Sequence, residues 1–121
     1  MENKRKVLVV DNSSDRKDRI RALKEKGFVV YPALRIAEAR TRCRPGSYDL
    51  IVIDSGEDQS GAIELCDSVR EKSPKQNLLL MVAKGSPVPA RDYVVSREPA
   101  ELAQKVEDIL KRRPTELGLV A

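Results

Sequence analysis

Short apolar segments alternate with segments of helical spacing along most of the chain, and this alternation limits the available folds more than any other feature. Each apolar segment is four or five residues long, a length typical of a buried strand and too short for a buried helix. Strands joined by helices form a parallel sheet with right-handed crossovers and helices on both faces. The predicted strands are Lys6–Val10, Phe28–Tyr31, Asp49–Ile53, Leu78–Val82 and Asp92–Val95.

The segments between the strands carry helix signals. The first predicted helix, residues 14–26, places Ile20 and Leu23 on one face and ends at Gly27, where a left-handed C-cap fits. Pro32 is expected to stop the second strand, and Pro45-Gly46 the second helix. The apolar faces of the remaining helices are Ile36, Ala39 (or Arg40) and Cys43 in the second, Ile63, Leu65, Cys66 and Val69 in the third, which ends near Lys72, and Leu102, Ala103, Val106, Ile109 and Leu110 in the last, which begins at Pro99.

Residues 83–91 interrupt the alternation. This segment holds two prolines and a glycine, and each interior proline would cost a helix about 3 kcal/mol. We therefore expect four full helices and an irregular segment in place of a helix between the fourth and fifth strands. The predicted fold is α/β: a doubly wound, flavodoxin-like, five-stranded parallel sheet of order 2-1-3-4-5. One domain spans residues 1–121, with its core in 6–112 and a tail at 113–121.

Composition excludes several classes of protein. The chain has no histidine, which removes the commonest general base, the commonest zinc ligand and the usual partner of a catalytic serine or cysteine. Cys43 and Cys66 lack metal-site spacing and are interpreted as reduced core residues. No apolar run reaches the roughly 20 residues of a membrane span, and no secretory stretch follows the N-terminus, so we expect a cytoplasmic protein.

The net charge of +4 arises from residues of both signs, with the basic ones concentrated in the first two predicted helices. We interpret this concentration as a solvated face, and we expect neither nucleic acid nor a membrane as a partner. These basic residues are Arg16, Lys17, Arg19, Arg21, Lys24 and Lys26, followed by Arg35, Arg40, Arg42 and Arg44.

Two aspartates follow neighbouring strands of the predicted sheet. Asp11 comes after the first strand and Asp54 after the third. In a sheet of order 2-1-3-4-5 these strands are adjacent, and their carboxyl ends form the edge at which such sheets bind ligands. Two carboxylates this close repel each other unless a cation or a proton lies between them. We expect Asp11 and Asp54 to face each other across an acidic pocket; alternatively, Asp54 only caps the strand end or the next helix.

Several segments resemble the receiver domain of two-component response regulators: VLVVDNSSD, GF, YDLIVIDS, the Val69-Arg70 helix end, and DYVVS followed by PAEL. The resemblance covers residues 6 to about 112. In that family an acidic pair and the aspartate ending strand three bind magnesium, and the latter aspartate accepts a phosphoryl group from a histidine kinase. Oxygen ligands suit a hard cation, and a carboxylate can act as a nucleophile. The resemblance implies a module of phosphorelay signal transduction and not an enzyme.

By this resemblance, Asp54 matches the phosphoacceptor and Asp11 one member of the acidic pair. Gly56 matches the loop position whose backbone carbonyl completes the metal site, and Tyr93 the aromatic switch position. Asn12 stands where the second acid is expected, which removes one negative charge from the pocket. No cofactor is required on this interpretation, and any magnesium bound by Asp11, Asp54 and Gly56 is expected to be held weakly.

Other positions depart further from the family pattern. Val82 replaces the switch Thr or Ser and has no hydroxyl for a phosphoryl oxygen. Ser96 replaces the lysine after strand five, and without that cation the charge developing on the phosphoryl oxygens loses a major stabiliser. Arg97, which replaces the following proline, and Lys84 are the candidates for a substitute cation.

These departures predict an atypical receiver, or pseudo-receiver, that acts by phosphorylation-independent protein–protein interaction. The alternative is a functional phosphoacceptor at Asp54 that receives its phosphoryl group from a histidine kinase. A third class, a phosphatase of the haloacid dehalogenase type, requires a second aspartate where the chain has Gly56. The expected partner is a histidine kinase or another signalling protein, and homodimer formation stays open.

Overall fold

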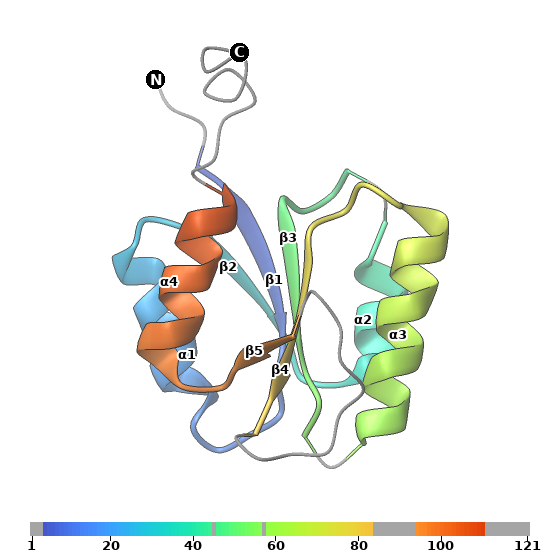
Figure 1. Ribbon diagram of the computed structural model, residues 1–121, viewed down its shortest axis with the longest axis horizontal. Helices are drawn as coiled ribbons and strands as arrows, with labels where there is room; N and C mark the ends of the chain where they lie inside the picture. Colours follow the sequence, from blue (N-terminus) through green and yellow to red (C-terminus); the bar gives the residue numbers. More distant parts are fainter. Residues whose placement is uncertain (1–3, 45, 57, 84–93, 111–121) are drawn as a thin grey trace.

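The computed structural model describes residues 4–44, 46–56, 58–83 and 94–110, and in them a parallel five-stranded sheet has helices on both faces (Figure 1). The strand order is β2-β1-β3-β4-β5. Both the fold class and the strand order predicted from the sequence are confirmed. The strands are β1 Lys6–Val10, β2 Val29–Ala33, β3 Leu50–Asp54, β4 Leu78–Val82 and β5 Val94–Ser96.

Two helical layers cover the sheet (Figure 1). Helices α1 (Arg16–Glu25) and α4 (Pro99–Leu110) lie on one face, and α2 (Ile36–Arg42) and α3 (Gln59–Lys72) lie on the other. Side chains of a strand point alternately to its two faces, so β1 contributes to both cores: Val7 and Val9 on the α1/α4 side, Leu8 and Val10 on the α2/α3 side. Both cores consist almost entirely of aliphatic side chains.

The register of the two central strands sets the position of the candidate site. Val10 pairs with Ile53 across β1 and β3. Asp11 and Asp54, the next residue of each chain segment, therefore leave the same carboxyl edge of the sheet side by side. β3 runs one residue further than predicted, so that Asp54 is itself the last residue of the strand.

Pro32 does not end β2, as the sequence had suggested, but lies within it. Successive residues of a strand direct their N–H and C=O groups to opposite sides, and the bonds Val29 N–H to Arg5 O and Asp11 N–H to Ala33 O, both 2.9 Å, fix which residues of β2 face β1. Pro32 faces the outer edge, where its missing N–H removes no ladder bond. Its carbonyl accepts a 2.7 Å hydrogen bond from Arg42 Nη1.

The end of α1 has the predicted glycine cap. Gly27 has φ +94°, and its N–H donates to Lys24 O at 2.9 Å. The inner face of α1, in contrast, is not the predicted pair Ile20 and Leu23. Arg19 and Leu23 are the buried residues of the helix, and Ile20 is only half-buried. Arg19 belongs to the candidate site described below.

Several predictions lie outside the described residues: the irregular segment over 84–91, the start of the fifth strand at Asp92, the positions of Tyr93 and Lys84, and the tail at 113–121. Across the helices in the described ranges, none combines the length and the apolar character that crossing a bilayer requires.

Candidate functional site

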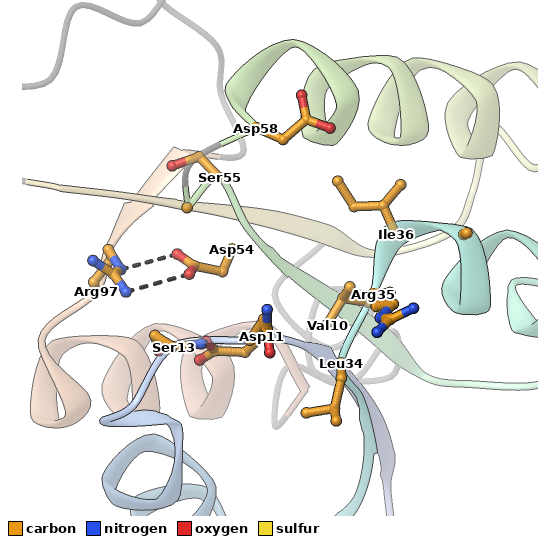
Figure 2. A pocket seen from close by; sticks show the side chains of 13 residues that line it. Val10, Asp11, Ser13, Leu34, Arg35, Ile36, Asp54, Ser55, Asp58 and Arg97 are labelled. Atoms are coloured by element: carbon orange, nitrogen blue, oxygen red, sulfur yellow. Dashed lines mark hydrogen bonds and ion pairs between the residues drawn. The ribbon is translucent and has the colours of Figure 1, made fainter.

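A pocket of about 690 Å³ lies at the carboxyl ends of β1 and β3 (Figure 2). Its size is within the range of small-ligand sites. One side is polar and is formed by the end of β3 and the segments that follow β1, β3 and β5; the other side comes from the β2–α2 connection and the first residues of α2. The polar side includes Asp11, Asn12, Asp54, Gly56 and Arg97, and the other side includes Leu34, Arg35, Ile36 and Ala37.

Asp11 is buried, and both of its carboxylate oxygens are engaged. Oδ1 accepts hydrogen bonds from the N–H of Ser13 at 2.9 Å and from Ser13 Oγ at 2.6 Å. Oδ2 lies 2.9 Å from Nε and 2.8 Å from Nη2 of Arg19. A carboxylate offers about four acceptor sites, so these contacts saturate Asp11.

Arg19 supplies the positive charge beside Asp11 and is itself only 1% exposed. Besides Asp11, its guanidinium bonds Asp15 through Nη2 at 2.9 Å and Nη1 at 3.2 Å. Nη1 also donates to the backbone carbonyl of Arg97 at 3.2 Å, and Nη2 donates to Ser13 Oγ. A buried arginine is stable only when paired and hydrogen-bonded, and here all three of its nitrogens have partners.

Asp54 is paired with a second arginine (Figure 2). Nε of Arg97 lies 2.9 Å from Oδ1 of Asp54, and Nη2 donates to Oδ2 at 3.3 Å. The Asp54 side chain is 4% exposed and that of Arg97 29%. Arg97, one of the two substitute cations suggested by the sequence, therefore contacts the carboxylate that matches the phosphoacceptor position. The residue that caps α3 is Asp58, whose Oδ1 accepts the Gly61 N–H at 2.9 Å.

The pKa values of the site follow from burial and charge. Desolvation, and then the nearby charge of Asp11, raise the pKa of Asp54 above the ordinary 3.8, although Arg97 and Arg19 oppose the change. A hydrogen bond from Arg19 is the main cause that lowers the pKa of Asp15 far below its usual range. Burial alone would lower the pKa of Arg19, but its bonds to Asp15 and Asp11 raise it. Arg19 is therefore a permanent cation.

A divalent metal ion does not fit these residues as they are arranged. Asp11 has no acceptor site left, and Asp54 is covered by a guanidinium. Any metal ion would have to displace Arg19 or Arg97 and would meet their positive charges. Considering only residues with described placement, no group of three or more His, Cys, Asp or Glu side chains is arranged to hold a metal ion.

The other residues predicted for the site are distributed as follows. Asn12 and Gly56 both line the pocket. Asn12 is exposed. Gly56 has φ +48° and donates its N–H to Asp54. Val82 and Ser96 are not among its lining residues and face each other across β4 and β5. Val82 packs against the α2/α3 core, and Ser96 Oγ accepts the N–H of Glu98 at 3.0 Å. Val82 and Ser96, which the resemblance matched to switch positions, thus make structural contacts.

Arg19, Asp15 and Ser13 belong to the site although neither the sequence pattern nor the resemblance points to them. Arg19 was grouped with the solvated basic residues of the first helix. Two spacings could have revealed it: Arg19 is four residues after Asp15, a helical ion-pair spacing, and four before the core residue Leu23. The spacing to Asp15 indicates an ion-pair partner, and the spacing to Leu23 indicates that Arg19 lies on the inner face of the helix.

No protein-family model matches the sequence, and no curated protein has a significant sequence match to it. Solved structures do match. The receiver domain of a response regulator from Francisella is 23% identical with a TM-score of 0.75, covering 90% of this chain and 98% of its own. The chemotaxis response regulator CheY4 of Vibrio cholerae is 20% identical with a TM-score of 0.73, covering 88% and 99%.

A chain from the crystal structure of the histidine kinase ThkA in complex with the response regulator TrrA is 24% identical, with a TM-score of 0.70, and the match covers 88% of this chain and 98% of that one. At identities of 20%, 23% and 24%, such likenesses establish a fold and leave the activity to be argued from the site. The chain has the fold of a response-regulator receiver domain.

Proposed function

We propose that this chain is an atypical receiver-like signalling domain that acts by binding a protein partner and not by accepting a phosphoryl group. The observation that carries the proposal is the pairing of two pocket carboxylates with arginines, Asp11 with Arg19 and Asp54 with Arg97. The charge balance that a receiver obtains from a bound metal ion is supplied here by the protein's own side chains.

The chemistry of phosphoryl transfer supports this proposal. Transfer to a carboxylate depends on a positioned nucleophile and on groups that stabilise charge on the phosphoryl oxygens. An Asp54 oxygen would have to leave Arg97 to attack, and the positions of the switch hydroxyl and the lysine hold Val82 and Ser96. Losing one preorganised charge-stabilising group costs about 3–4 kcal/mol of barrier, a factor of several hundred in rate.

The proposed partner is a histidine kinase or another signalling protein, and the proposed location is the cytoplasm. The likeness to a chain solved in a complex of a histidine kinase with a response regulator supports a partner of this class. The domain is proposed to have no enzymatic activity of its own. Self-association as a homodimer is a further binding mode that the same proposal allows.

The test is intact-mass spectrometry after incubation with a small-molecule phosphodonor and magnesium. We expect most of the wild-type protein to keep its mass, because the nucleophile is held by Arg97 and its usual cationic assistance is absent. Asp54→Ala is the matched control. A substantial population heavier by one phosphoryl group, lost in Asp54→Ala, would contradict the proposal.

A second candidate function is phosphoacceptance at Asp54 from a histidine kinase, and the position of Arg97 is the observation that favours it. A guanidinium held against the nucleophile could stabilise the phosphoryl oxygens after a small movement. Arg97→Gln separates the two candidates. If Arg97 assists transfer, the modified fraction falls in this variant; if Arg97 blocks Asp54, the fraction stays low or rises.

A further inference from the structure

Arg19 connects three segments that are far apart in the sequence. Its guanidinium bonds Asp11 at the end of β1, Asp15 before α1, and the backbone carbonyl of Arg97 between β5 and α4. Arg19 and Arg97 are separated by 78 positions. One fully buried side chain therefore fixes the start of α1, the end of β1 and the β5–α4 connection relative to one another.

Arg97 extends this connection to the central strand β3. Its carbonyl accepts from Arg19, while its guanidinium contacts Asp54 and lies 3.9 Å from Asp15 Oδ1. The residue is thus held at its backbone and at the tip of its side chain. Its neighbour Glu98 is also fixed, because its N–H donates to Ser96 Oγ at 3.0 Å.

We infer that Arg19 and Arg97 form a built-in cation pair that takes the place of a bound divalent metal ion and holds the β5–α4 connection against the ends of β1 and β3 in one arrangement. We call this pair the arginine clamp. The inference deepens the proposed function and rests on it for the identity of the site. It assigns a positioning role to Arg19, a residue that is not among the positions matched to the receiver family.

The geometry of the two side chains explains why arginine is suited to this task. The planar guanidinium offers five donors in a fixed fork, whereas a lysine ammonium is a compact point charge. Arg19 uses this fork on Asp11, Asp15 and the Arg97 carbonyl at once. A metal ion can bind and leave, but a clamp made of side chains is always present. The arrangement around Asp54 is then independent of metal concentration.

The first test compares thermal unfolding in about 10 mM MgCl2 with unfolding in NaCl of equal ionic strength, for wild type, Arg19→Gln and Arg21→Gln. Arg21 is exposed on the same helix and serves as the matched control. We expect no difference between the two salts for wild type and Arg21→Gln. Arg19→Gln should melt about 10 °C or more below wild type, because two aspartates lose their partner, and magnesium should recover part of this loss.

A specific rise in the wild-type melting temperature with magnesium would overturn the inference, since the clamp leaves no site for the metal ion. Equal responses of Arg19→Gln and Arg21→Gln would overturn it as well. The wild-type result is informative even if Arg19→Gln does not fold.

The second test uses NMR of the arginine Nε–H groups. In wild type, the Nε–H signal of Arg19, which is hydrogen-bonded to Asp11, should be protected from solvent exchange, and the Nε–H signals of both Arg19 and Arg97 should be unchanged by magnesium. In the conservative variant Arg19→Lys, which keeps the charge but loses the fork, the Arg97 Nε–H and the amides of residues 96–98 should shift and exchange faster. Unchanged Arg97 signals in Arg19→Lys would overturn the positioning role.

These outcomes are independent of the phosphodonor experiment. A protein that gains a phosphoryl group at Asp54 yet shows no metal response in wild type would refute the proposed function and leave the clamp standing. A protein that stays unmodified but binds magnesium would do the reverse.

Discussion

At the scale of single residues, the main feature of the site is that its buried charged side chains form ion pairs with one another. Asp11, Asp54 and Arg19 would each be strongly destabilising if left alone in the interior. Their pairing brings segments from both ends of the chain to one point. A carboxylate held by a guanidinium is a poor metal ligand and a hindered nucleophile, and the proposed function rests on this pairing.

Asp54 is predicted to make the wild type relatively more stable as the pH falls. Its pKa is higher in the folded protein than the ordinary 3.8 of an unfolded chain, chiefly because of burial. The folded state then binds the proton more tightly, so ionised Asp54 lowers the free energy of unfolding above its folded pKa, and this penalty disappears as the pH falls below 3.8. Asparagine does not titrate. The free energy of unfolding of wild type relative to Asp54→Asn should therefore rise on acidification.

Urea denaturation at a series of pH values measures this difference. Asp15→Asn provides a control of opposite sign, because the pKa of Asp15 is lowered mainly by its bond from Arg19. The stabilisation from Asp15 is complete above 3.8 and is lost as the pH falls through the lowered pKa. Two variants with the same slope would be inconsistent with the opposite environments of these aspartates.

At the scale of elements, local sequence chemistry sets the boundaries of the helices. The edge strand of the sheet can also hold a proline, which an inner strand could not. Gly27 ends α1 in a left-handed conformation, and Asp58 caps α3. Pro32 lies in β2 because β2 is an edge strand. With no N–H at Pro32 and its carbonyl bonded by Arg42, this edge offers few groups to another strand. We therefore expect partners to bind through side chains and not by adding a strand here.

Asp58→Ala is predicted to lower the free energy of unfolding by about 1 kcal/mol, the usual cost of removing an N-cap. The Gly61 N–H loses its acceptor in this variant. Asp58→Asn is the matched control, since asparagine caps helices about as well as aspartate. Urea denaturation of both variants gives the comparison, and an equal loss in both would show that charge, and not the cap, is what matters at this position.

At the scale of the whole molecule, two aliphatic cores on either side of one sheet hold the site in place. The inner strands β1, β3 and β4 are buried on both faces along most of their length, so a change of side-chain volume inside them disturbs the packing. The site itself contributes charges that are balanced by pairing, and the apolar layers below the pocket keep the ends of β1 and β3 adjacent.

Leu79→Ala is predicted to lower the free energy of unfolding by about 2–5 kcal/mol, because Leu79 is 1% exposed in the α1/α4 core and alanine would leave a cavity. Leu34→Ala should change it by less than about 0.5 kcal/mol, because this leucine is 44% exposed. Chemical denaturation of the two variants tests the prediction. Comparable losses would mean that Leu34 carries a packing role in solution.

Local patterns along the chain are enough to predict the layers of the fold and the placement of two candidate site residues. Five apolar segments joined by helical spacing specify a parallel sheet, since strand and helix periods are local properties of the chain. Once the strands are in order, Asp11 and Asp54 must leave the same edge. The apolar stripe of the last helix and the cap at Gly27 were predictable for the same reason.

How the charges pair depends on contacts between segments that meet only when the chain folds. Arg19 appears in the sequence as one of several basic residues on a surface helix, and its burial depends on where α1 lies relative to the end of β1 and to Arg97. The contact of Arg97 with Asp54 joins residues 43 positions apart. The place of Pro32 within β2 likewise depends on that strand being at the edge. Local periodicity reports which residues are apolar, but the partner of a buried charge is fixed by the packing of distant segments.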